Sequence, residues 1–168
     1  MFKLSFLSLL LVTSFASAEE ARRANAHVHG LNNLSMVISQ NQVAISYEMP
    51  IVQLLDEHDE HDDHDELTVS DETLATFNNY SQLFELPKGA GCHLTSFESG
   101  LHSVSTEGDH KDVELSYEFA CSNPSQLKNL TINAFDRFSE LETLNFEAVI
   151  NNKALTKSLK SDVNKAIF

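Results

Sequence analysis

The fold of this chain is decided by residues 31–50, which read LNNLSMVISQNQVAISYEMP. Two runs of alternating apolar and polar residues flank a turn at Gln40 and Asn41, which is the pattern of a β-hairpin. A two-residue turn sets the cross-strand partners as Ile38 with Val43, Met36 with Ile45, and Leu34 with Tyr47. One face of the hairpin is therefore apolar, and Pro50 ends the second strand because it lacks a backbone N–H.

The rest of the chain continues this alternation. Strands are predicted at residues 92–98, 113–121, 130–135, 143–150 and 154–159, with a polar loop at 100–111 and a hairpin turn at Asn151 and Asn152. One amphipathic helix should begin after the N-cap Ser70, with a core-facing stripe of Leu74, Phe77, Tyr80 and Phe84, and end at Pro87. We therefore predict a β-dominant α+β fold, an antiparallel sheet or sandwich with one main amphipathic helix packed against it.

Residues 1–18 have the pattern of a signal peptide. Lys3 is followed by the apolar run Leu4–Val12 and by the small-residue cleavage site Ala16-Ser17-Ala18. The apolar run is shorter than the roughly 20 residues that span a bilayer, and no later run is long enough, so we expect no stable membrane insertion. Removal of residues 1–18 would leave residues 19–168 as a single exported domain.

The two cysteines of the chain, Cys92 and Cys121, are both in this exported part. In an oxidising compartment such a pair is typical of a disulfide. The alternative, two thiolate ligands of a metal ion, would require reduced thiols there.

The acidic tract, residues 56–66, is the main functional signal. It holds eight carboxylates and three histidines, His58, His61 and His64, and no apolar or basic side chain. Such a segment cannot bury apolar area, so we expect a mobile loop. Imidazole and carboxylate are ligands of divalent metals, which favours a metal-binding loop over the alternative, a plain acidic linker.

The motifs of two other metal sites are missing from the tract. It has no glycine for the turn of a calcium loop, and it lacks the His-Glu-x-x-His pattern of zinc proteases. The net charge of the whole chain is −14, which argues against nucleic acid and anionic membranes as partners. Divalent cations are the natural partners.

A second histidine group, His27 and His29, comes just before the hairpin. At positions i and i+2 of an extended segment both imidazoles point the same way and can share one ion, unless Gly30 interrupts the strand. A surface pair without a ligand is the alternative. His102 and His110 are weaker candidates, because a single histidine is more often a surface residue.

Several stretches together resemble the zinc-regulated periplasmic proteins of the ZrgA type. They are residues 27–31, the hairpin to Pro50, residues 83–87 leading to Cys92, residues 117–121 followed by Pro124, and residues 135–142. The resemblance implies a periplasmic protein that binds Zn²⁺ and buffers it or delivers it to the zinc ABC uptake system. It places His27 and His29 in the family's His-x-His-Gly start, and the acidic tract in its histidine-rich insertion.

Three other functions remain open on the residues alone. Copper and nickel also bind imidazole, although a thioether copper site is disfavoured because Met36 should be buried. A structural envelope protein, whose acidic surface loop only solvates it or binds calcium, is the second alternative. An enzyme is the least favoured, because no nucleophile-base spacing or catalytic metal motif is present.

Overall fold

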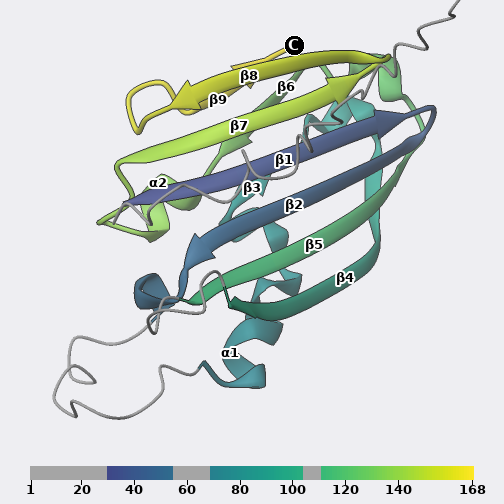
Figure 1. The fold of residues 1–168 in the computed structure, drawn as a ribbon. Helices are drawn as coiled ribbons and strands as arrows, with labels where there is room; N and C mark the ends of the chain where they lie inside the picture. The colour runs from purple at the N-terminus through teal and green to yellow at the C-terminus, as the bar shows by residue number, and fades with distance from the viewer. Residues whose placement is uncertain (1–29, 55–68, 104–110) are drawn as a thin grey trace, which may run out of the picture.

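The computed structural model describes residues 30–54, 69–103 and 111–168, which form two packed β-sheets (Figure 1). The larger sheet has the order β4-β5-β2-β1-β7-β8 and the smaller one β3-β6-β9. The larger sheet consists of β1 (Leu31–Ser39), β2 (Gln42–Pro50), β4 (Cys92–Ser103), β5 (Lys111–Cys121), β7 (Thr143–Ile150) and β8 (Lys153–Leu159). The smaller one consists of β3 (Phe84–Glu85), β6 (Asn129–Ile132) and β9 (Lys165–Ile167). With the short helices α1 (Asp71–Ala75) and α2 (Ala134–Arg137), this confirms the predicted β-dominant α+β class.

The predicted hairpin has the predicted register. Ile38 pairs with Val43, Met36 with Ile45 and Leu34 with Tyr47. Gln40 has a φ of 56°, a left-handed conformation that suits the twist of a two-residue hairpin turn. The turn between β7 and β8 differs in that both of its central residues are left-handed, since Asn151 and Asn152 have φ values of 50° and 64°.

The larger sheet is mixed rather than fully antiparallel. β1 pairs with β2 antiparallel on one side and with β7 parallel on the other. A parallel neighbour requires a long crossover, and here the chain between β1 and β7 contains β2, β4 and β5 of the larger sheet and β3 and β6 of the smaller one. Alternation within single strands could not show this, because pairing partners far apart in sequence leave no local signal.

The core lies between the two sheets. Figure 1 shows β3, β6 and β9 behind one face of the larger sheet, and the alternate apolar residues of its strands are buried there. Aromatic rings join the layers, with Tyr80 and Phe119 at 4.8 Å and Phe84 and Tyr117 at 5.3 Å between ring centroids. The Tyr117 hydroxyl donates to the Phe77 carbonyl at 2.9 Å, so the polar end of this buried ring is satisfied.

The predicted helix is correct at its start and too long at its end. The Ser70 hydroxyl accepts the Thr73 N–H at 3.1 Å, as expected for an N-cap, but α1 ends at Ala75. Residues 76–78 and 80–82 form 3-10 turns, separated by Asn79 with ψ of 77°. Phe84 then enters β3, where it pairs with Ile132. Packing of the aromatic residues against β5 and strand pairing therefore override the helical period.

Three other boundaries differ from the prediction. β4 continues to Ser103 into the predicted polar loop, because β5 offers it a partner along that length. The strand predicted at 130–135 ends at Ile132, and its last residues belong to α2. β9 was not predicted, since its three residues are stabilised by pairing with β6 rather than by any pattern of their own.

Gly30 interrupts the alternation in front of β1. Its φ is +82°, and a Cβ there would lie 2.7 Å from the carbonyl oxygen of Glu140. Only glycine fits this close approach in this backbone conformation. The facing predicted for His27 and His29 therefore does not follow from the alternation of β1.

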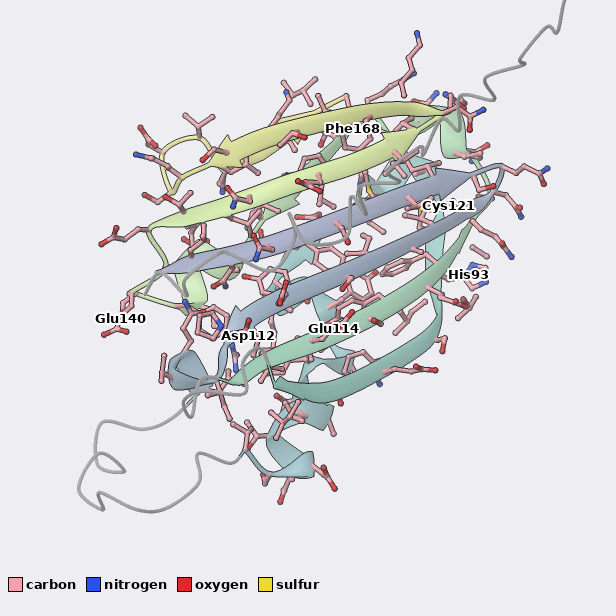
Figure 2. The ribbon with its side chains drawn as sticks, viewed as in Figure 1. His93, Asp112, Glu114, Cys121, Glu140 and Phe168 are labelled. Carbon is pink, nitrogen blue, oxygen red and sulfur yellow. A yellow bond between two sulfur atoms is a disulfide. The ribbon has the colours of Figure 1, made fainter. Side chains whose placement is uncertain are left out.

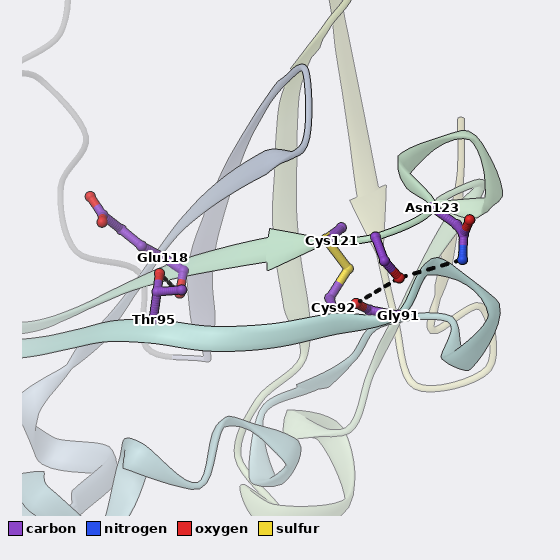
Figure 3. The surroundings of a disulfide bond; sticks show 7 residues. Gly91, Cys92, Thr95, Glu118, Cys121 and Asn123 are labelled. Atoms are coloured by element: carbon purple, nitrogen blue, oxygen red, sulfur yellow. Dashed lines mark hydrogen bonds between the residues drawn. A yellow bond between two sulfur atoms is a disulfide. The ribbon is translucent and has the colours of Figure 1, made fainter.

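The predicted disulfide between Cys92 and Cys121 is confirmed (Figure 3). These residues are direct cross-strand partners in β4 and β5, with an S–S distance of 2.02 Å. Beside them the Ser122 hydroxyl donates to the carbonyl of Gly91 at 3.4 Å. The bond therefore joins the edge strand to the sheet where β4 begins.

We expect the Cys92→Ser, Cys121→Ser double variant to lose about 3 to 4 kcal/mol of unfolding free energy, because its unfolded chain regains the freedom of a loop whose ends are separated by 29 residues. Urea denaturation of the parent and the variant measures this. A Ser122→Ala variant, which changes a neighbouring polar contact and keeps the disulfide, is the control. An equal loss in that control would contradict the chain-entropy explanation.

Candidate functional site

Four strand ends meet at one end of the larger sheet, which we call the proximal end. They are the start of β1 at Leu31, the end of β2 at Pro50, the end of β4 at Ser103 and the start of β5 at Lys111. The register aligns them, because Pro50 pairs with Asp112 and Ser103 with Lys111 (Figure 1). The opposite, distal end has the Gln40–Asn41 turn and the disulfide.

All three histidine-bearing segments join the described fold at the proximal end. His29 directly precedes Gly30, the acidic tract follows Leu54, where the 3-10 turn 51–54 after β2 ends, and His110 directly precedes Lys111. His27, His29, His58, His61, His64 and His110 themselves lie outside the described residues. His102 lies in β4 and is the cross-strand partner of Asp112, so its backbone is also at this end.

A group of carboxylates occupies the proximal end. Glu48 of β2 and Glu114 of β5 are direct cross-strand partners, and Asp112 lies two residues before Glu114 (Figure 2). Asp112 is buried, with 5% of its surface exposed, and it forms a side-chain hydrogen bond with Glu48. The negative charge of a neighbouring carboxylate disfavours ionisation of Glu48.

Glu48 shows the electrostatic result of this arrangement. Its partial burial, followed by the charge of Asp112 and the hydrogen bond that protonated Glu48 donates to Asp112, raises the pKa of Glu48 above the ordinary 4.5. Glu114 adds a smaller repulsion, and the Asn33 side chain opposes the shift by donating to Glu48 Oε2 at 3.5 Å. A cation near Glu48 would stabilise its ionised carboxylate, because an opposite charge nearby favours the charged form.

Side-chain hydrogen bonds extend from this group across four strands. Asn145 of β7 donates to Asn33 Oδ1 at 3.2 Å, and Asn33 donates to Glu48. The Ser46 hydroxyl donates to Glu114 Oε1 at 3.0 Å. Both glutamates lie on the face of the sheet opposite the core, because their neighbours Tyr47, Met49, Val113 and Leu115 are buried.

Sequence reasoning missed these carboxylates. The exposed positions of β2 and β5 were visible from the alternation, but nothing in the sequence placed Asp112 in a buried position or next to Glu48. The signal that could have found them is the pairing of β2 with β5, which puts acidic residues opposite each other without an intervening lysine.

His93, unlike His102, belongs to the distal end of the sheet. It is exposed near the start of β4 and pairs with Ala120, beside the disulfide at the distal end (Figure 2). Within residues 30–54, 69–103 and 111–168, no group of three or more His, Cys, Asp or Glu side chains is placed to hold a metal ion. A metal site at the proximal end would therefore need histidines from the adjoining segments.

Comparison with models of protein families gave a match over most of the chain. The model of the ZrgA family, described as zinc uptake proteins, matches residues 26–168. Comparison with curated proteins gave no match. In the part of the chain that the structure describes, none of the helices is long and apolar enough to cross a membrane.

The unfolding free energy should decrease as the pH rises from 4.5 through the raised pKa of Glu48, because the folded state holds this proton more tightly than the unfolded state. Glu48→Gln should remove this part of the pH dependence. Chemical denaturation at several pH values between 4 and 8 measures it. Glu147→Gln is the control, since Glu147 is exposed on β7, two strands away from β2. A Glu48→Gln profile parallel to that of the parent would contradict the explanation.

Proposed function

Because the chain belongs to the ZrgA family of zinc uptake proteins, we propose that it binds Zn²⁺ in the periplasm and buffers it or delivers it to the zinc ABC uptake system. The observation that carries the proposal is the convergence at the proximal end. Three histidine-bearing segments that are far apart in sequence join the fold there, next to a carboxylate group. Imidazole nitrogen and carboxylate oxygen are ligands that zinc uses in proteins.

In this proposal the two histidine groups have different roles. His27 and His29, adjoining the rigid start of β1, form a tight site with further ligands from the fold or from the acidic tract. His58, His61 and His64 capture ions loosely, and the eight carboxylates around them raise the local concentration of cations. His102 and His110 are candidates for completing the tight site, because His102 lies near the end of β4 and His110 directly precedes β5 at the same end.

Periplasmic location is supported by two further features. Residues 1–18 have the pattern of a cleaved signal peptide, and the Cys92–Cys121 disulfide suits an oxidising compartment. The proposed activity is binding and transfer of the ion rather than catalysis, because the sequence has no nucleophile-base spacing.

The proposal predicts two classes of zinc site. Isothermal titration of residues 19–168 should show a tight phase that is lost in the His27→Ala, His29→Ala variant, and weaker sites that are lost when residues 56–66 are deleted. His93→Ala is the matched control, because it removes an exposed imidazole at the distal end and should leave both phases unchanged.

The outcomes separate the alternatives. Absence of zinc binding to the parent at neutral pH would overturn the proposal and favour a structural envelope protein. Competition titrations with Cu²⁺ and Ni²⁺ test the choice of metal, since copper has the higher intrinsic affinity for such ligands. A growth defect of the 56–66 deletion under zinc limitation is expected only from a role in uptake.

Zinc affinity should fall as the pH drops below about 6.5, because only neutral imidazole binds the ion. The neighbouring carboxylates stabilise the imidazolium, so the fall should begin at a somewhat higher pH for the acidic tract. Titrations at pH 5.5, 6.5 and 7.5 measure this. Affinity that stays constant over this range would exclude histidine as the main ligand.

A further inference from the structure

The larger sheet has two edge strands, β4 and β8, and they differ in character. β8 carries Lys153 and Lys157, and lysine on an edge strand discourages pairing with another chain. β4 is longer, with twelve residues, and contains neither lysine nor proline. From Glu98 to Leu101 every residue of β4 is exposed, and Leu101 is 40% exposed.

The register shows which backbone groups of β4 face outward. The Cys121 N–H donates to the Asn41 carbonyl on the β2 side and so points away from β4. In an antiparallel strand the backbone N–H and C=O groups of every second residue point in the same direction. Where such a residue of β5 pairs with a residue of β4, the backbone groups of the two residues point away from each other. The residues of β4 paired in this way with Tyr117, Leu115 and Val113 are Phe97, Ser99 and Leu101. Their N–H and C=O groups therefore face outward, and no other strand of the described residues pairs with them.

A hollow lies beside this edge. It has a volume of about 220 Å³ and is lined by Glu98, Ser99, Gly100, Leu101, Glu114 and Ser116. Gly100 pairs with Glu114 and has no atom within 4 Å of the position of a Cβ, so the lack of a side chain opens the space between strands. The carboxylates of Glu98 and Glu114 are the charged groups of its lining.

We propose that the edge of β4 docks an extended strand of a partner protein, and that a Lys or Arg side chain of this strand enters the hollow between Glu98 and Glu114. Strand addition obtains affinity from main-chain hydrogen bonds and specificity from pockets for alternate side chains. Phe97, Ser99 and Leu101 supply the main-chain groups, and the hollow over Gly100 supplies the pocket.

The charge of the edge selects a basic partner over a second copy of this chain. The chain has a net charge of −14, and a second β4 would bring its own Glu98 and no Lys or Arg to the contact. Like charges across a strand pair are destabilising, whereas a cation between Glu98 and Glu114 is stabilised by both.

The test uses three synthetic seven-residue peptides and residues 19–168 without added metal. The first peptide alternates threonine and valine around a central lysine, the second has glutamate in its place, and the third is the lysine peptide with N-methylated backbone. NMR titration should show shifts at residues 97–101 with the lysine peptide alone. Glu98→Gln and Glu114→Gln should each weaken its binding about two- to fivefold, as expected for one exposed ion pair.

Two variants isolate the backbone contribution. Ser99→Pro removes one outward N–H and leaves the hydrogen bonds to β5 intact, so it should abolish binding, and its thermal unfolding shows whether it is folded. Ser99→Ala keeps the N–H and should bind like the parent. The acidic tract also attracts a lysine peptide, so the titration is repeated with the chain lacking residues 56–66. This variant should bind the lysine peptide as the parent does.

Four results would overturn the proposal. The first is equal binding of the lysine and glutamate peptides, and the second is undiminished binding of the N-methylated peptide. The third is loss of binding when residues 56–66 are deleted. The fourth is a dimer of the parent in light scattering that Ser99→Pro converts to a monomer, because the occupant of the edge would then be a second copy.

Discussion

The register between β1 and β2 is the constraint on which the rest of this structure depends. A two-residue turn at Gln40 and Asn41 leaves one pairing that keeps the apolar residues of both strands on the same face. β5 then pairs along β2, and β4 along β5, in registers that continue this face. A slip of one residue would turn the core residues of β2 outward and move Glu48 and its neighbours into the core.

The same register gives the two ends of the sheet different chemistry. The distal end is closed by a tight turn and by the disulfide, which hold β1 to β2 and β4 to β5. At the proximal end the strands lead into the segments that contain histidines, and Glu48 and Asp112 lie at that end. The disulfide and the hairpin turn are therefore at one end of the sheet, and this pair of carboxyl groups is at the other.

The fold and the candidate site were predictable to different degrees. Tyr117 and Phe119 were placed in the core by the alternation of their strand, and the hairpin partners followed from turn geometry. The length of α1 was not predictable, because Phe84 fits a helical stripe as well as it fits the short strand that pairs with Ile132. The histidines were visible from composition alone, but Asp112 became part of the site only through the pairing of β5 with β2.

The sequence by itself determined the local properties of this protein: the strands with period-two burial, the hairpin register, the pairing of its two cysteines and the acidic, histidine-containing composition of residues 56–66. These depend on neighbours within a few residues or on composition. Only the tertiary structure decided the parallel pairing of β1 with β7, the position at one end of Gly30, Leu54 and Lys111, which adjoin the histidine-bearing segments, the contact of Glu48 with Asp112, and the place of β4 at the edge of the sheet. The physical reason is that strand order and cross-strand contacts are set by packing between residues far apart in the chain. The local sequence pattern does not show which of these distant residues will pack together.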